Sequence, residues 1–174
     1  MHGNETKNRL TMNGMIEDKY AYGSVDVAEY IVAYANENHF VVNMTKMQKL
    51  LYIAYGVYLA VKGRRLTDEH PHAWPYGPVF PRTRRKLLDV PFDNVDYPEK
   101  LSGNAELRSL VRLVFDNFGK YNAAALSEWS HKPNSPWDKT VSGDGFRWGD
   151  FISDKDIKPY FYNLIIWNKN DAQR

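Results

Sequence analysis

The chain has 174 residues, of which 43% are hydrophobic and 25% are charged, so it is long enough for one domain with its own core. Lysine and arginine exceed aspartate and glutamate by only 2, which gives no reason to expect a dedicated polyanion-binding protein. The absence of cysteine excludes disulfides, thiolate zinc sites and cysteine nucleophiles.

No segment has the pattern of a membrane span or an export signal. The longest apolar run, residues 50–61, is shorter than the roughly 18 residues that a span requires. The N-terminus (MHGNETK) lacks the apolar core of a signal peptide, so we expect a cytoplasmic protein without a membrane partner. Aromatic residues are abundant (12 Tyr, 8 Phe and 5 Trp), which predicts a core or an interface built on rings.

The N-terminal part predicts a tail followed by a helix. Residues 1–23 have no helical or alternating apolar period, and we expect them to form a poorly ordered tail. Ser24 is a typical N-cap, and apolar residues at helical spacing follow it to about residues 36–38.

The strongest helical pattern runs from about Thr45 to Lys62. Its apolar positions are Met47, Leu50, Leu51, Ala54, Val57, Tyr58 and Val61, with Ile53, Leu59 and Ala60 on the opposite side. Because a helix that is apolar nearly all round is usually central, we expect this one to be buried. Asn43 or Thr45 is expected to cap it, and Lys62-Gly63 to end it.

Proline and glycine interrupt the middle of the chain. Residues 64–78 predict a loop with a short hairpin. Pro81 then begins a helix that reaches about Leu88, and residues 89–103 are again rich in turn formers. A second clean amphipathic helix runs from Leu107 to Phe118.

The C-terminal part predicts two more helices. Asn122 caps a short helix to Trp129, residues 133–152 are irregular with a short strand at 146–148, and Ser153 caps the last helix. The expected fold is mainly α: one compact domain of about six helices over residues 24–168, with at most a small hairpin or short strands. Residues 169–174 are expected to form a C-terminal tail.

The residues carry no pattern that predicts catalysis. The chain lacks a glycine-rich phosphate loop, a serine–histidine–aspartate order and a carboxylate pair at functional spacing, so we expect neither an enzyme nor a bound cofactor. His70 and His72 flank a proline without a third ligand at useful spacing, so we expect no metal site.

Two neighbouring features predict a binding surface. Residues 74–78 (WPYGP) carry Trp74 and Tyr76 in a loop that proline restricts, and the rings either anchor an interface or plug the core. Arg82, Arg84 and Arg85 follow at a helix start, where the helix dipole disfavours cations. These cations either form a solvated face or are compensated by an acidic partner or a phosphate.

Several segments, in a fixed order, resemble the Panacea domain of SocA-type antitoxins and of many phage-associated proteins. They are residues 26–31 (DVAEYI), 46–56 (KMQKLLYIAYG), 73–79 (AWPYGPV), Leu126-Ser127, His131 and 135–137 (SPW). The resemblance covers roughly residues 24–165, and the ordered series is specific where any one segment alone would be weak.

The resemblance implies a mainly helical protein that binds and neutralises a toxin encoded beside it. In the SocA type, the antitoxin is also an adaptor that delivers the toxin to a cytoplasmic protease. The resemblance implies no catalytic activity and does not identify the toxin. Lys49 and Tyr52 recur in the shared motif without belonging to the main apolar stripe, so we hypothesise that they join Trp74, Tyr76 and the three arginines in partner binding.

The alternative function is a DNA-binding regulator of a phage or mobile element that uses residues 82–86 (RTRRK). A helix-turn-helix formed by the first two helices is disfavoured, because the second helix is too apolar to lie in a DNA groove.

Overall fold

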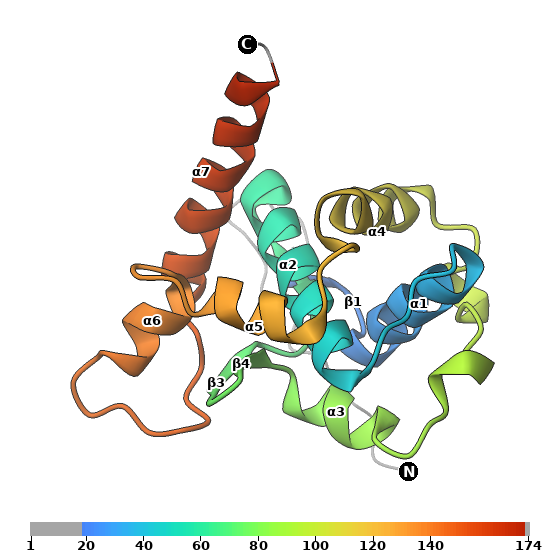
Figure 1. Ribbon diagram of the computed structural model, residues 1–174, viewed down its shortest axis with the longest axis horizontal. Coiled ribbons are helices and arrows are strands. Elements are labelled where there is room, and N and C mark those ends of the chain that lie inside the picture. The colour runs from blue at the N-terminus through green and yellow to red at the C-terminus, as the bar shows by residue number, and fades with distance from the viewer. Residues whose placement is uncertain (1–18, 173–174) are drawn as a thin grey trace, which may run out of the picture.

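Helices arranged around one central helix make up most of the computed structural model, which describes residues 19–172 (Figure 1). The helices are α1 (Ser24–Glu37), α2 (Met44–Lys62), α3 (Pro81–Leu87), α4 (Ala105–Phe118), α5 (Ala123–Ser130), α6 (Pro136–Val141) and α7 (Asp154–Asp171). The strands are β1 (Tyr20–Tyr22), β2 (Arg65–Thr67), β3 (His72–Trp74) and β4 (Gly77–Val79). The predicted mainly helical fold is therefore confirmed.

The central helix is α2, as its sequence pattern predicts. Every residue from Lys46 to Ala60 is buried, and α1, α4, α5 and α7 all pack against this helix. The side chain of Asn43 caps its first turn by accepting a hydrogen bond from the amide of Lys46 at 2.8 Å. Gly63 ends it with a left-handed φ of 72°, a conformation that glycine adopts without strain.

The first half of α7 lies across α2 at a point where the two backbones come close. A Cβ atom added to Gly56 would lie 2.2 Å from the ring of Phe161, so only glycine fits at this crossing. The second half of α7 projects from the body of the molecule (Figure 1). Ile166 and Trp167 are accordingly exposed there, although both are large hydrophobic residues.

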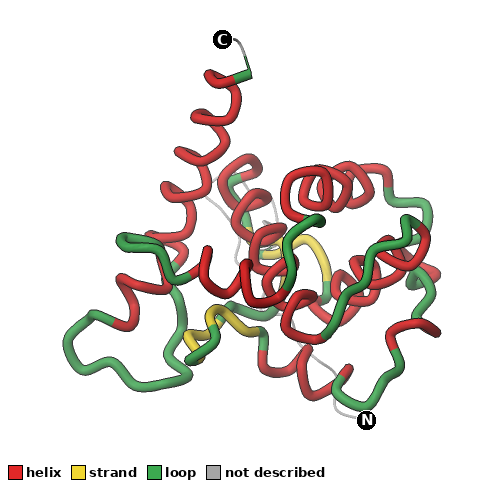
Figure 2. The backbone as a smooth tube through the Cα atoms, viewed as in Figure 1, coloured by secondary structure: helices red, strands yellow, loops and turns green. Residues whose placement is uncertain are grey.

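Two small sheets complete the fold (Figure 2). Strands β1 and β2 pair in parallel, with Tyr20 opposite Arg65. Strands β3 and β4 form the predicted hairpin between α2 and α3, with Trp74 opposite Gly77.

The structure differs from the sequence expectations at four places. Residues 1–18 of the predicted tail lie outside the described residues, but Tyr20–Tyr22 form a strand because β2 supplies hydrogen-bond partners for their backbone. Gly23, not Ser24, is the N-cap of α1. Residues 146–148 form no strand. Helix α6 was not predicted; Ser135 is its N-cap and Pro136 is its first residue. Helix α7 continues through residues 169–171, which were expected to be a tail.

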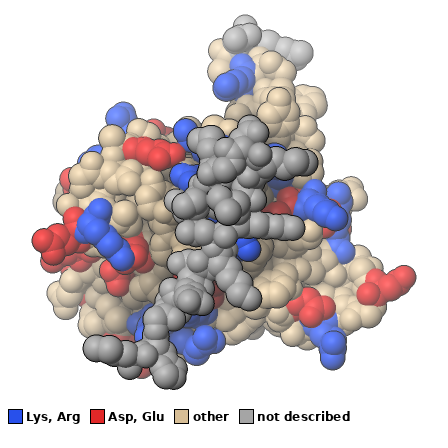
Figure 3. Space-filling model, turned by 180° about the vertical axis from the view of Figure 1, so that it is seen from behind, with Lys and Arg blue, Asp and Glu red and all other residues tan. Residues whose placement is uncertain are grey.

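The surface carries both signs of charge. Seen from behind, basic and acidic side chains are interspersed over the visible face, in agreement with the small net charge (Figure 3). Between residues 19 and 172, no helix is both long enough and apolar enough to cross a membrane.

Candidate partner-binding site

A groove of about 380 Å³ lies where the start of α2, the β3–β4 turn and α3 meet. We call it the aromatic groove. Its lining residues are Met44, Thr45, Gln48, Lys49, Trp74, Pro75, Tyr76, Val79 and Arg84. The fold thus brings together four of the residues that the sequence singled out, from three separate elements.

One wall of the groove is the β3–β4 turn, which is held firmly from behind. Trp137 Nε1 donates a hydrogen bond to the backbone oxygen of Trp74 at 2.9 Å, and His131 stacks on the Trp137 ring at 3.8 Å. Gly77 has a φ of 109°, and a Cβ atom there would lie 2.5 Å from Ser130 Oγ. The turn therefore presents the Tyr76 side chain, 76% exposed, on a rigid support.

The floor of the groove is polar and comes from α2. Gln48 clamps the backbone of Phe80, because its Oε1 accepts from the Phe80 amide at 2.8 Å and its Nε2 donates to the Phe80 carbonyl. Lys49 Nζ donates to the carbonyl oxygen of Pro78 at 3.0 Å. Burial lowers the pKa of Lys49 to about 8, because desolvation disfavours the charged ammonium.

The burial of Lys49 and Tyr52 corrects the sequence interpretation of both residues. Each side chain is only 1% exposed, so neither offers a surface to a partner in this conformation. Lys49 does not pair with a surface acid, and the ring of Tyr52 packs edge-on against Phe161 with centroids 5.5 Å apart. In this fold, Lys49 thus packs α2 against the hairpin and Tyr52 packs it against α7.

Arg82 is held within the fold by acidic residues of the chain. Its guanidinium lies 2.6 Å from Asp68 Oδ2 and donates to Ser24 Oγ at 2.9 Å. Glu69 accepts from the amides of Arg82 and Thr83 at the start of α3. These carboxylates at the helix start compensate Arg82 within the fold, so Arg82 does not need an acidic partner.

Sequence reasoning missed the role of Asp68 and Glu69, which also support the start of α1. The amide of Ser24 donates to Asp68 Oδ1 at 2.9 Å, and Ser24 Oγ donates to Glu69 Oε1 at 3.0 Å. The two adjacent acids are visible in the sequence before α3, but only the fold shows that the starts of α1 and α3 converge on them.

Of the remaining cations of the basic run, Arg84 lines the aromatic groove. The guanidinium of Arg84 sits 5.6 Å from the centre of the Trp74 ring, in a cation–π arrangement that orders both side chains. Arg85 and Lys86 are exposed at the next two positions. The groove therefore has rings at its centre and cations at its edge.

Comparisons with known proteins agree with the predicted resemblance. The family model for the antitoxin SocA-like Panacea domain matches residues 47–138, which include every lining residue of the aromatic groove except Met44 and Thr45. The antitoxin SocA of Caulobacter vibrioides (strain NA1000 / CB15N) is 32% identical over 130 residues, which span 66% of this chain and 69% of that protein. No solved structure matches the chain. The chain belongs to the family of SocA-like antitoxins with a Panacea domain.

Proposed function

We propose that the protein is an antitoxin that neutralises a cognate toxin by direct contact at the aromatic groove. Family membership supports a toxin partner in general terms. The observation that carries the choice of surface is the exposed Tyr76 ring, which stands on a rigid turn directly beside Arg84.

The chemistry of the groove indicates what kind of surface it would bind. Central rings and a charged edge are the usual division of an interface into a core that excludes water and a rim that orients the partner. The side chains of Met44, Trp74 and Val79 would receive an apolar side chain, while Arg84 and Arg85 would face carboxylates. The matching toxin surface is an apolar anchor flanked by acidic residues.

Three finer features of the function do not depend on the geometry of the groove, and one of them, the adaptor role, rests on the family resemblance alone. We propose that the chain acts without catalysis and in the cytoplasm, and that it delivers the bound toxin to a protease as an adaptor. We also propose residues 24–168 as the unit that folds and binds. Coexpression with the product of the neighbouring gene, in cells with and without the protease, tests the adaptor role: toxin lifetime should shorten only where both antitoxin and protease are present.

The Tyr76→Ala variant is expected to weaken the toxin complex by more than about 1 kcal/mol, because a ring anchored in a partner pocket contributes at that level. Since the side chain is 76% exposed in the free protein, the stability of the fold should hardly change. The measurement is the Kd for the neighbouring gene product, together with growth rescue. Tyr121→Ala, which removes another exposed tyrosine outside the groove, is the matched control. If both variants bind like the parent, the toxin docks elsewhere.

Reversal of Arg84 and Arg85 to glutamate is expected to slow association with the toxin, by a factor that shrinks as salt is added. Stopped-flow or surface-binding kinetics at two ionic strengths measure this factor. Arg85→Glu alone keeps the Arg84–Trp74 contact and separates charge from packing. Reversal of Lys132 and Lys139, two exposed lysines away from the groove, makes the same change in net charge and should have a smaller effect. If the two double reversals slow association equally, the association rate depends only on the net charge of the protein.

A further inference from the structure

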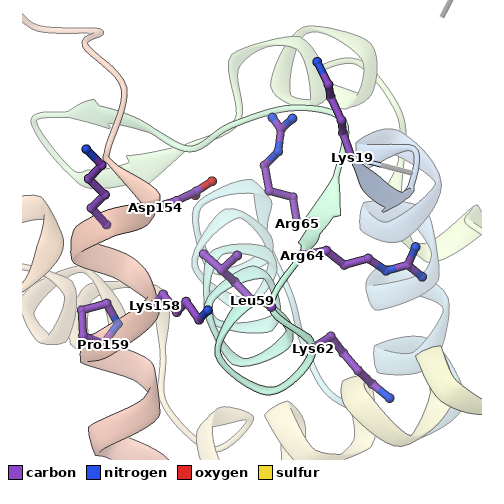
Figure 4. A pocket seen from close by; sticks show the side chains of 10 residues that line it. Lys19, Leu59, Lys62, Arg64, Arg65, Asp154, Lys158 and Pro159 are labelled. Atoms are coloured by element: carbon purple, nitrogen blue, oxygen red, sulfur yellow. The ribbon is translucent and has the colours of Figure 1, made fainter. Parts of the chain in front are cut away.

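A second cavity, of about 710 Å³, lies between the C-terminal end of α2 and the first turns of α7 (Figure 4). We call it the basic cavity. Its charged lining consists of Lys19, Lys62, Arg64, Arg65, Lys155, Lys158 and a single acid, Asp154. It shares no lining residue with the aromatic groove, so a ligand here would not occupy that groove.

The cations reach this cavity from separate parts of the chain. In Figure 4 the Lys158 side chain extends from α7 toward the end of α2, whereas Arg65, from β2, and Lys19, from the residue before β1, extend side by side away from that end. The Lys158 ammonium lies 3.9 Å from the position that a Cβ atom on Gly63 would occupy, so this side chain bridges the two helices. The fold thus concentrates positive charge that is dispersed in the sequence.

The acids near the cavity are already engaged. Asp154 accepts from the Tyr55 hydroxyl at 2.7 Å and lies 3.3 Å from His70 Nε2, while Arg65 lies 3.0 Å from His70 Nδ1. Because arginine only donates, His70 accepts at Nδ1 and carries its proton at Nε2, and it thereby links Asp154 to Arg65.

Glu106, an acid among residues 19–172 that does not line the cavity, lies 3.6 Å from the lining residue Lys62 in an exposed pair. The negative charge of Asp154 balances that of Arg65, and the charge of Glu106 balances that of Lys62. Among the described residues, the ammonium groups of Lys19, Lys155 and Lys158 then have no counter-charge. Over residues 19–172, none of these three forms an ion pair. An anionic ligand would therefore find uncompensated charge without displacing an existing partner.

We propose that the basic cavity binds a ligand with two or more adjacent phosphate groups, held by Lys19, Lys155 and Lys158. Lysines act as mobile point charges that suit phosphate oxygens. The volume is that of a small-ligand site, which usually measures about 300–1,000 Å³. Among residues 19–172, the apolar side chains that line the cavity are Leu59 and Pro159, and none of the lining residues is an aromatic ring on which a base could stack. Recognition is thus of phosphates and not of a base.

Calorimetric titration of the full chain with orthophosphate, pyrophosphate and inorganic triphosphate tests the proposal. Affinity should rise at least tenfold from orthophosphate to triphosphate and fall as salt is added, because each further phosphate engages a further lysine. Adenosine triphosphate should bind about as tightly as inorganic triphosphate, because the cavity offers nothing to the base. Triphosphate that binds no better than orthophosphate would overturn the proposal.

Matched variants locate the site. Lys155→Gln combined with Lys158→Gln should lower the triphosphate affinity at least tenfold, and since both side chains are exposed the fold should be retained. Lys132→Gln combined with Lys139→Gln removes the same charge elsewhere and should change the affinity less than twofold. If both double variants lose the same triphosphate affinity, binding depends only on the net charge of the protein, and the proposed site in the basic cavity is refuted.

A short DNA duplex distinguishes two sources of the phosphates. If the duplex displaces triphosphate, and if its binding requires Lys155 and Lys158, the ligand of the cavity is a nucleic-acid backbone. A duplex that does not compete makes a small polyphosphate the ligand.

Discussion

Replacement of Leu51 by alanine is expected to lower the free energy of unfolding by about 2–5 kcal/mol, the range for a fully buried leucine. Leu51 is 0% exposed and lies in the middle of α2, which contacts α1, α4, α5 and α7. Truncation would remove apolar contacts and leave a cavity that the surrounding helices cannot close without moving. Loss of packing in the centre of the fold therefore has the largest effect that we expect from a single substitution.

Chemical denaturation, monitored by the circular dichroism of the helices, measures this loss. Leu113→Ala is the control, because Leu113 is 48% exposed on α4 and its truncation should cost far less. A midpoint that hardly moves in the Leu51→Ala variant would show that α2 is peripheral, against its observed burial.

The second large effect concerns the buried ammonium of Lys49. Its pKa is about 8 in the folded protein and 10.5 in a solvated chain, since burial penalises the charged form. Between these two pH values the unfolded chain binds more protons than the folded one, so raising the pH favours folding. Relative to a Lys49→Met variant, the parent should gain about 1.4 kcal/mol of stability per pH unit in this window, and nothing below it.

The comparison with Lys49→Met isolates this residue, because the buried tyrosines Tyr52 and Tyr55 titrate in both proteins and cancel. Denaturant titrations at pH 7, 8, 9 and 10 give the difference in unfolding free energy, which should be constant up to about pH 8 and then rise in favour of the parent. A difference that does not vary with pH would mean that Lys49 is solvated in the folded state.

Lys49 also links the core to the aromatic groove. Its Nζ holds the Pro78 carbonyl, and a Cβ atom on Gly77 would lie 2.6 Å from its Cε. The same side chain therefore fixes the turn that presents Tyr76. If the groove binds the toxin, Lys49→Met should weaken the complex through the position of this turn, even where the fold is retained.

The groove was partly predictable from the sequence. The proline-restricted rings of Trp74 and Tyr76 and the cations after them are local signals, and the fold places Tyr76 and Arg84 on one groove. The predicted sites at Lys49 and Tyr52 are buried instead, because a recurring motif marks a position as constrained without telling whether packing or binding constrains it.

The elements themselves follow from the sequence wherever the determinants are local. Apolar periodicity places α2 and α4, and the side chains of Asn43 and Asn122 cap the helices that follow them, because capping acts within three residues. Helix α6 carries the same kind of signal at Ser135 and Pro136, so it too was within reach of sequence reasoning.

Tertiary structure alone decided the contacts between distant residues. Asp68 supports the start of α1 from 44 residues away, β1 exists because β2 lies beside it, and Lys19 and Lys158 line the same cavity from opposite ends of the described chain. Side-chain spacing within one element cannot encode such pairs, because they depend on how helices pack around α2. The sequence by itself therefore determined most of the helices and the family, because their signals are local, whereas packing decided which charged residues are paired within the fold and which stay exposed.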